Sequence, residues 1–270
     1  MDGRADHLAQ SPIGCGKIKN QRNGQPLSVH LHVCLAGKIF QSRRLPTTIM
    51  SANTPQELQR LYAERFGQMT EYRKAVWQVL IQDYFQNFIP KDGTVLDLGC
   101  GYGEFINQIK CRKKYAMDLN PDAPQRVASD VQCLLQDCST RWPLPDNSLD
   151  TVFTSNFFEH LPNKPALDAT TSEAYRCLKP GGRLIAMGPN IRYLPGEYWD
   201  FWDHHLALTD KSLVELLNSR NFKIESCVPR FLPYSMAGGP QYPLWCLKLY
   251  LSLPLLWPIR GRQFLVIATK

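Results

Sequence analysis

The spacing of hydrophobic positions divides the chain into an irregular N-terminal part and a regular remainder. Residues 1–50 show no sustained period, and Gly, Gln, Asn, Ser and Pro interrupt them throughout. After residue 54, short β-rich apolar runs alternate with segments in which apolar residues recur every three or four positions. This alternation predicts an α/β fold, a doubly wound and mostly parallel sheet with helices on both faces.

The expected elements have definite boundaries. Thr54-Pro55-Gln56-Glu57 combines an N-cap, a first-turn proline and a capping-box acid, and a second helix begins at Thr70. Its apolar stripe runs from Tyr72 to Phe88, and Thr209 caps a later helix. Two further helices are expected over residues 103–111 and 166–178, and seven strands over residues 94–98, 114–118, 131–136, 149–155, 183–188, 222–228 and 263–269.

Composition narrows the class of protein. The chain has 270 residues, 44% hydrophobic and 20% charged, which excludes wholesale disorder and a small disulfide scaffold. No uncharged apolar run reaches the ~18 residues of a membrane span. Nine cysteines with no CxxC pair and no zinc-finger spacing predict reduced thiols, no metal site and a cytoplasmic location.

Charge is unevenly distributed along the chain. The net charge of +7 is concentrated at the two ends: residues 1–50 carry +5, residues 226–270 carry +5, and the middle is mildly acidic. A nucleic-acid binder would be basic more uniformly, so no nucleic-acid partner is expected. We expect residues 1–50 to be a poorly ordered extension and residues 51–270 to be the functional domain. A targeting peptide and a natural start at Met50 stay open for the extension.

The most informative stretch follows the first strand, where Asp97-Leu98-Gly99-Cys100-Gly101-Tyr102-Gly103 leads into Glu104. Glycines permit a left-handed backbone and close approach of a ligand. A dinucleotide fingerprint would place its third glycine one residue later, and the two acids would repel a pyrophosphate. Acids beside the loop suit a ligand with a positive centre, such as the sulfonium and ammonium groups of S-adenosylmethionine.

The next two strands also end in acids. Asp118 lies 21 residues after Asp97 and is positioned to accept ribose hydroxyls, and Asp137 ends the third run, where it could accept from an adenine amine. A lone acid at a strand end is often only a cap. Three acids at successive strand ends favour a nucleoside site.

The stretch 94–188 resembles the class I S-adenosylmethionine-dependent methyltransferases, in a broad bacterial small-molecule branch. The matching pieces are Val95–Gly103, Ala116–Asn120, Gln136–Cys138, Leu149–Leu161 and Leu178–Ile185. The resemblance implies seven strands, the last antiparallel, and an enzyme with S-adenosylmethionine as cofactor. Residues implied to hold the cofactor are Asp97, Gly99, Cys100, Gly101, Gly103, Asp118, Leu119, Asp137, Cys138 and Asn156. Ser155-Asn156-Phe157-Phe158 lacks the prolines of adenine-methylating DNA enzymes.

The acceptor side is expected after strand five, beyond the carboxyl ends of the strands. Asn190, Tyr198, Trp199 and Trp202 are candidate contacts for a small-molecule acceptor. His204 and His205 are candidate bases for an oxygen acceptor, while Glu159-His160 is interpreted as scaffold. An aromatic lid and backbone-bonded loop histidines are the structural alternatives.

The segment 229–262, an insertion between strands six and seven, carries six prolines and a Trp- and Leu-rich run beside Arg260 and Arg262. It predicts either a peripheral membrane or lipid contact through residues 243–262, or a helix packed over the sheet or a homodimer contact. The function predicted is methyl transfer to a small-molecule, glycan-linked or lipid-linked acceptor, at oxygen. A nucleotide-dependent oxidoreductase and a catalytically silent cofactor-binding partner subunit are the alternatives.

Overall fold

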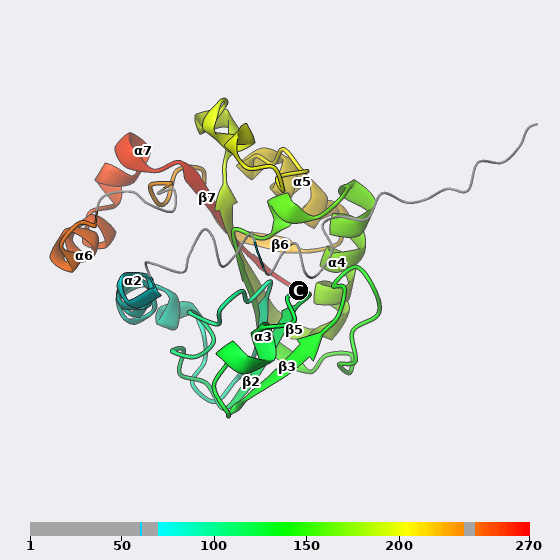
Figure 1. Ribbon diagram of the computed structural model, residues 1–270. Coiled ribbons are helices and arrows are strands. Elements are labelled where there is room, and N and C mark those ends of the chain that lie inside the picture. The colour runs from blue at the N-terminus through cyan, green and yellow to red at the C-terminus, as the bar shows by residue number, and fades with distance from the viewer. Residues whose placement is uncertain (1–59, 61–69, 235–240) are drawn as a thin grey trace, which may run out of the picture. The chain divides into compact units, whose positions relative to one another are not determined.

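A computed structural model describes residue 60, residues 70–234 and residues 241–270. The described residues all belong to one compact unit of the chain, residues 48–270. The expected N-terminal extension and the helix start at Thr54 lie outside the described residues. Figure 1 shows the arrangement of the described elements around a central sheet.

The sheet has seven strands in the order β3-β2-β1-β4-β5-β7-β6. β7 runs antiparallel to β5 and β6, and the other pairs are parallel, so the predicted fold is confirmed. The strands are β1 (Thr94–Leu98), β2 (Lys113–Asp118), β3 (Val131–Leu135), β4 (Leu149–Ser155), β5 (Leu178–Pro189), β6 (Lys223–Val228) and β7 (Gln263–Thr269).

Strand register brings the segments with the predicted site residues to one edge of the sheet. Leu98 of β1 pairs with Met117 of β2 and with Thr154 of β4. The residues that follow these three strands therefore emerge side by side at the carboxyl edge. The strand order also reverses between β1 and β4, which is the place where open α/β sheets bind ligands.

Helices cover both faces of the sheet (Figure 1). α4 (Lys164–Cys177) and α5 (Asp210–Ser219) pack on one face, around a core that includes Leu98, Val152 and Leu184. α2 (Thr70–Asp83) and α6 (Leu244–Ser252) contribute to the opposite core, which includes Phe153 and Ile185. This double cover explains why all five residues of β1 are buried.

The short elements lie mainly in the connections. The helices are α3 (Ala123–Arg126) and α7 (Trp257–Arg260), and the 3-10 segments are η1 (Phe85–Phe88), η2 (Phe158–His160), η3 (Ile191–Tyr193), η4 (Glu197–Asp200) and η5 (Pro254–Leu256). The two largest boundary differences from expectation are that α2 ends at Asp83, before Phe88, and that β5 begins at Leu178; other ends differ by one or two residues.

The expected helix over 103–111 is wrong. This segment forms turns, closed by bonds from Asn107 N to Gly103 O and from Ile109 N to Phe105 O, both 3.0 Å. Two side-chain amides take up nearby backbone groups instead. Asn107 bonds to the Arg126 carbonyl and the Ala128 amide, and Gln108 bonds to the Glu104 carbonyl. Such side-chain competition with the backbone disfavours a regular helix.

Candidate active site at the carboxyl edge of the sheet

The glycine loop after β1 has the backbone that its sequence predicts. Gly99, Gly101 and Gly103 have φ values of +70°, +53° and +75°, a conformation that costs most residues about 1–2 kcal/mol. The loop is fixed to β2, because Gly99 N donates to the Met117 carbonyl and Gly101 N donates to Asp118 Oδ2, both at 2.8 Å.

Gly99 also permits a close contact across the site. A Cβ at this position would lie 2.2 Å from Cγ of Phe157, whose side chain comes from the residues after β4. A side chain at Gly99 would therefore collide with the aromatic ring. Because Gly99 has no side chain, the glycine loop can pack directly against Phe157, which follows β4.

Acidic side chains, those of Asp97, Glu104 and Asp118, lie close to this loop. Asp97 is 3% exposed, and burial followed by the charges of Glu104 and Asp118 raises its pKa well above the ordinary value. Burial also raises the pKa of Asp118, against the lowering effect of the Asn120 and Gly101 amides that donate to it. Arg73 pairs with Glu104 at 2.8 Å. Burial therefore opposes the ionisation of Asp97 and Asp118 unless a cationic ligand lies beside them.

The ends of β2 and β3 supply apolar surface beside polar groups. Leu119 and Leu135 are 39% and 52% exposed although both are large hydrophobic residues. Asp137 is exposed and accepts from the Ser139 amide and hydroxyl at 2.8 and 2.7 Å. Cys138 is buried against the Thr170 hydroxyl, 3.3 Å away.

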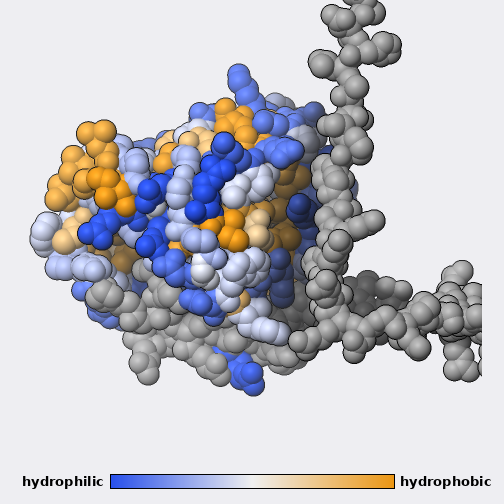
Figure 2. All heavy atoms as spheres, turned by 90° about the horizontal axis from the view of Figure 1, so that it is seen from above, coloured by the Kyte–Doolittle hydropathy of each residue, from blue (hydrophilic) through white to orange (hydrophobic). Residues whose placement is uncertain are grey.

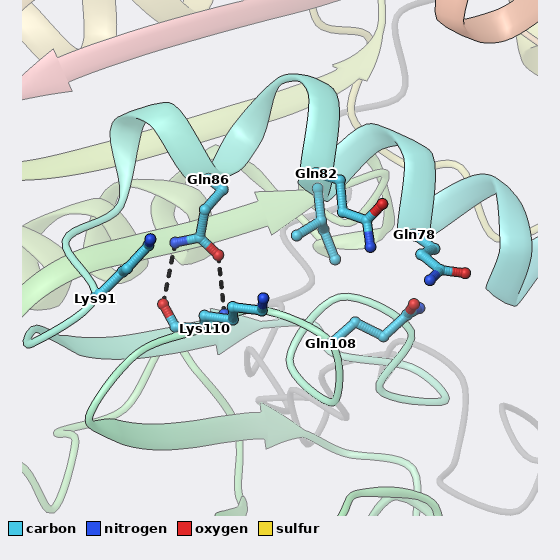
Figure 3. A pocket seen from close by; sticks show the side chains of 7 residues that line it. Gln78, Gln82, Gln86, Lys91, Gln108 and Lys110 are labelled. Atoms are coloured by element: carbon cyan, nitrogen blue, oxygen red, sulfur yellow. Dashed lines mark hydrogen bonds between the residues drawn. The ribbon is translucent and has the colours of Figure 1, made fainter.

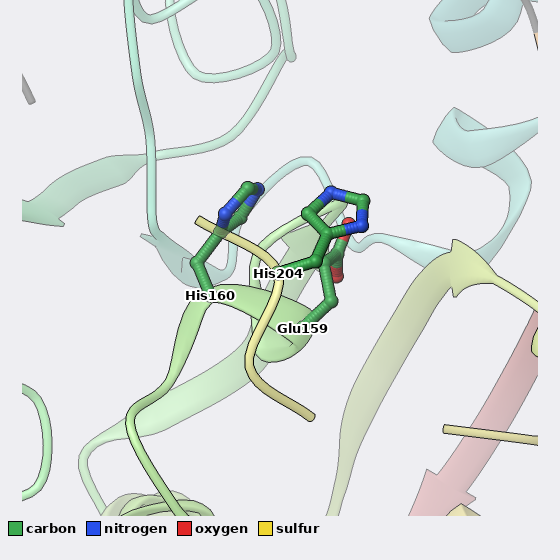
Figure 4. A group of neighbouring side chains, drawn as sticks. All are labelled: Glu159, His160 and His204. Carbon is green, nitrogen blue, oxygen red and sulfur yellow. The ribbon is translucent and has the colours of Figure 1, made fainter. Parts of the chain in front are cut away.

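A second polar cluster lies at the end of β4. Glu159 and His160 are in η2, and His204 is in the loop after η4 (Figure 4). The two segments are joined by the backbone amides of His205 and Leu206, which donate to the Glu159 carbonyl at 2.8 and 3.1 Å. One potential ligand atom from each of Glu159, His160 and His204 lies within 4.8 Å of the others.

The electrostatics of this cluster are set by burial and by Asp203. Burial raises the pKa of Glu159 to about 7. Burial alone would lower the pKa of His160, but its hydrogen bond with Asp203 and the charges of Glu159 and Asp203 raise it. His160 Nδ1 lies 3.0 Å from the Asp203 carbonyl oxygen and 3.3 Å from Asp203 Oδ2.

The predicted acceptor-side residues are divided between surface and interior. Trp199, Trp202 and His205 are exposed, whereas His204 is buried with its Nδ1 2.8 Å from the Tyr198 carbonyl. Tyr198 is fully buried, and its hydroxyl donates to the Leu206 carbonyl.

Asn190 is also fully buried, and its amide donates to Asp210 at 2.8 Å and to the Pro229 carbonyl at 3.0 Å. Substrate contacts by Asn190 and Tyr198 stay predictions, and both side chains have structural partners inside the protein.

Sequence reasoning missed Asp203 altogether and treated Glu159-His160 as scaffold. The signal available was Asp203-His204-His205 in a loop expected at the same edge as residues 159–160. Nothing in the spacing could show that Asp203 contacts His160, because 43 positions separate them.

A separate polar pocket of about 370 Å³ lies between α2 and the segment around Gln108. Gln86 closes one side by bonding to the backbone of Lys110 in both directions, at 3.0 Å each (Figure 3). None of the predicted site residues lines it. It therefore does not compete with the carboxyl edge as the active-site candidate.

Comparison with known proteins agrees with this fold. Residues 96–186 match the family described as methyltransferase domain. The chain is 29% identical over 145 residues to a probable S-adenosylmethionine-dependent methyltransferase of Mycolicibacterium smegmatis, covering 51% of this chain and 54% of that protein. It is 27% identical over 188 residues to demethylmenaquinone methyltransferase of Symbiobacterium thermophilum, covering 60% and 73%.

A solved structure shares the fold. It is a SAM-dependent methyltransferase from Archaeoglobus fulgidus, with a TM-score of 0.56 and 19% identity, covering 76% of this chain and 99% of that one. The chain spans about half the length, or less, of several curated relatives that it matches.

The fold is that of the Rossmann-like methyltransferases. Residues 96–186, about a third of the chain, match the methyltransferase domain, and this match implies S-adenosylmethionine as the cofactor. It favours methyl transfer over the oxidoreductase alternative.

The residues present fit that cofactor. Asn156 has φ +49°, and its buried Oδ1 has no hydrogen-bond partner within the described chain, nor does Asn120 Nδ2. Unpaired buried polar atoms are rare in folded proteins, and both lie next to the strand ends that the cofactor would occupy. Acids below the loop and exposed leucines beside it complete a site for a cationic nucleoside.

Proposed function

We propose that this protein transfers a methyl group from S-adenosylmethionine to an oxygen of a small-molecule, glycan-linked or lipid-linked acceptor. One observation carries the proposal: the Asp118 carboxylate fixes the glycine loop at the same sheet edge that bears the Glu159, His160 and His204 cluster. When bound, S-adenosylmethionine supplies a methyl group on a cationic sulfur, which an acceptor displaces in line. Positioning supplies much of the acceleration in such a reaction.

On the cofactor side, each residue has a proposed task. Gly99, Gly101 and Gly103 allow the methionine end to approach the backbone, above the negative potential of Asp97. Asp118 would accept the ribose hydroxyls, since each of its oxygens has accepted one amide and retains a lone pair. Leu119 and Leu135 would cover the adenine ring, with Asp137, Cys138 and Cys100 nearby.

On the acceptor side, an oxygen nucleophile must lose a proton. The groups proposed to receive it are the imidazoles of this edge, namely His204 and His205 from the sequence and His160, which Asp203 orients. A carboxylate that holds an imidazole in one orientation is a familiar support for a general base. Trp199 and Trp202 are exposed and would border the acceptor.

A lipid-linked acceptor is favoured by the surface of α6, η5 and α7. Large apolar side chains are exposed there, among them Leu255 at 87%, Ile259 at 66% and Trp245 at 64%. Figure 2 shows hydrophobic side chains at the left of the molecule, the side on which α6 and α7 lie in Figure 1. Residues 226–270 contain five basic and no acidic residues, which suits an anionic membrane surface.

Two further observations bear on this acceptor class. No helix among the described residues is both long and apolar enough to cross a bilayer, so contact would be peripheral. The Symbiobacterium relative is named for a demethylmenaquinone acceptor. The name of that relative supports an apolar acceptor for this chain.

Calorimetric titration with S-adenosylmethionine tests the cofactor side. Asp118→Asn should weaken binding by about 1–3 kcal/mol because the hydrogen bonds to ribose are weakened. Asp130→Asn is the matched control: this exposed carboxylate pairs with Lys114 at the opposite, amino end of the strands. Equal affinity in both variants, with unchanged circular dichroism, would refute the ribose assignment.

Transfer from labelled S-adenosylmethionine to fractionated polar and lipid extracts tests the activity. A labelled product in one fraction identifies the acceptor class, whereas cofactor binding without transfer to any fraction favours a silent partner subunit.

Sedimentation with vesicles of anionic lipid tests the membrane contact. Leu255→Glu should reduce binding, and Trp202→Glu, equally exposed but outside this surface, should not.

A further inference from the structure

Glu159, His160 and His204 form a compact set of potential metal-donor atoms at the end of β4. One donor atom from each lies within 4.8 Å of the others. Figure 4 shows the two imidazoles and the carboxylate gathered from η2 and the 203–206 loop. The amides of His205 and Leu206 hold the two segments together through the Glu159 carbonyl. The set is therefore built into the fold.

Each of the two imidazoles has its Nδ1 within hydrogen-bond distance of a backbone carbonyl oxygen. His204 Nδ1 is 2.8 Å from the Tyr198 carbonyl, and His160 Nδ1 is 3.0 Å from the Asp203 carbonyl. A carbonyl oxygen only accepts, so each Nδ1 carries the proton. In the neutral ring this leaves the lone pair on Nε2. Metal-binding histidines have this arrangement, in which a carbonyl or carboxylate fixes the tautomer.

The Glu159 carboxylate supplies an independent reason to expect a ligand. The residue is only 2% exposed, and its carboxylate interacts with its own backbone amide, but no ion pair joins it to a lysine or arginine among the described residues. Buried carboxylates are almost always hydrogen-bonded, paired with a cation or bound to a metal.

We propose that Glu159, His160 and His204 bind one divalent transition-metal ion, such as Zn²⁺, Mn²⁺ or Co²⁺. Two imidazole nitrogens and one carboxylate oxygen are a donor set that these ions favour over Mg²⁺ or Ca²⁺. Ligand atoms bound to one such ion lie about 3.4 Å apart, so the three side chains would draw together by about 1 Å. Three protein ligands leave a coordination position open, as in catalytic metal sites.

The role of this ion rests on the proposed function. The open position would take the acceptor oxygen at the carboxyl end of β4, beside the proposed cofactor site. A bound cation lowers the pKa of a coordinated hydroxyl, so its proton passes to solvent water, because His160 and His204 would hold the metal and could not also receive the proton. Asp203 would then be a positioning residue that holds His160 through Nδ1.

Metal binding can be measured without any acceptor. The full chain, stripped with chelator, is titrated with Zn²⁺ by calorimetry and with Co²⁺ by visible absorption. We expect one ion per chain with a Kd below about 1 μM, and a Co²⁺ spectrum without thiolate charge transfer, since the proposed ligands include no cysteine. Glu159→Gln and His204→Ala should each weaken binding at least 100-fold. Asp203→Asn removes the carboxylate charge beside His160 but keeps the backbone carbonyl contact, so it should weaken binding by about 10-fold.

His205→Ala is the matched control, because His205 is adjacent to His204 but exposed. It should keep the wild-type Kd. The inference is wrong if the stripped protein binds neither ion below 100 μM, or if Glu159→Gln and His204→Ala, folded by circular dichroism, bind as tightly as wild type. If either variant does not fold, the wild-type Co²⁺ spectrum and Asp203→Asn decide.

Titration of the same stripped protein with S-adenosylmethionine separates the two proposals. Cofactor binding without any metal binding supports the proposed function and overturns the metal site. Metal binding without cofactor binding supports the metal site and overturns the proposed function.

Discussion

The contact between Gly99 and Phe157 gives a sharp test of how the glycine loop is built. In Gly99→Ala the new Cβ would lie 2.2 Å from Cγ, 2.3 Å from Cδ2 and 2.7 Å from Cβ of Phe157. Ordinary carbon contacts are about 3.5–4.0 Å, so the ring would have to move by more than an ångström. The residue at position 99 must also keep φ at +70°.

Two costs therefore add in this variant. The left-handed backbone costs an alanine about 1–2 kcal/mol. Forcing a methyl group into a filled space typically costs a further 1–3 kcal/mol. We expect Gly99→Ala to lower the free energy of unfolding by about 2–5 kcal/mol, and to weaken S-adenosylmethionine binding, because the loop must shift.

A double-mutant cycle separates the two costs. Phe157→Gly removes all three atoms that the new methyl group would meet, so in that background Gly99→Ala should cost only the backbone part, about 1–2 kcal/mol. Urea unfolding followed by far-UV circular dichroism gives the four free energies. The reasoning fails if Gly99→Ala costs the same in both backgrounds, since Phe157 would then not be what excludes a side chain.

Three further substitutions test other parts of the structure. Because the folded state raises the pKa of Asp97, this residue begins to destabilise the fold once the pH exceeds its pKa in the unfolded chain, and it does so fully above its pKa in the folded state. In thermal melts without cofactor, the melting temperature of Asp97→Asn should therefore rise relative to that of wild type as the pH goes from 4 to 8. A difference in melting temperature that stays constant with pH would contradict this. Phe153→Ala should cost about 3–5 kcal/mol in urea unfolding, because the buried ring stacks on Phe105 at 3.7 Å; under 1 kcal/mol would mean that the contact is unimportant. Thr209→Ala should cost about 1 kcal/mol by the same assay, because Thr209 Oγ1 accepts from Ser212 N in the capping box of α5, whereas Thr209→Ser should cost little.

The sheet was predictable because its strands bury both faces. A short, continuous apolar run such as Thr94–Leu98 predicts a strand buried on both faces of a parallel sheet, and the glycines that follow it mark the carboxyl edge of the sheet. The helix expected over 103–111 failed for a reason that only the fold supplies. Asn107 bonds to the backbone of Arg126 and Ala128, which lie about twenty residues further along the chain and are brought near by the fold.

The site was predictable only where it follows the strands. Asp118 could be placed from the chain, because a strand end is a local feature and the loop bond to Gly101 follows from register. The cluster around Glu159 could not. It depends on the 203–206 loop folding back onto η2, and that contact is made by backbone amides that carry no sequence signal.

The carboxyl edge combines two places where burial opposes ionisation. Burial raises the pKa of Asp97 and Asp118 beneath the glycine loop, and that of Glu159 at the end of β4. These buried acids accept hydrogen bonds from backbone amides, but burial still opposes their ionisation, so each costs free energy when it is charged without a cation beside it. Their arrangement is explained if ligands of positive charge complete the site, a sulfonium at the first place and a metal ion at the second. Since the two places share an edge and Phe157 contacts Gly99 between them, we expect each ligand to affect the affinity of the other, and by linkage to the same degree.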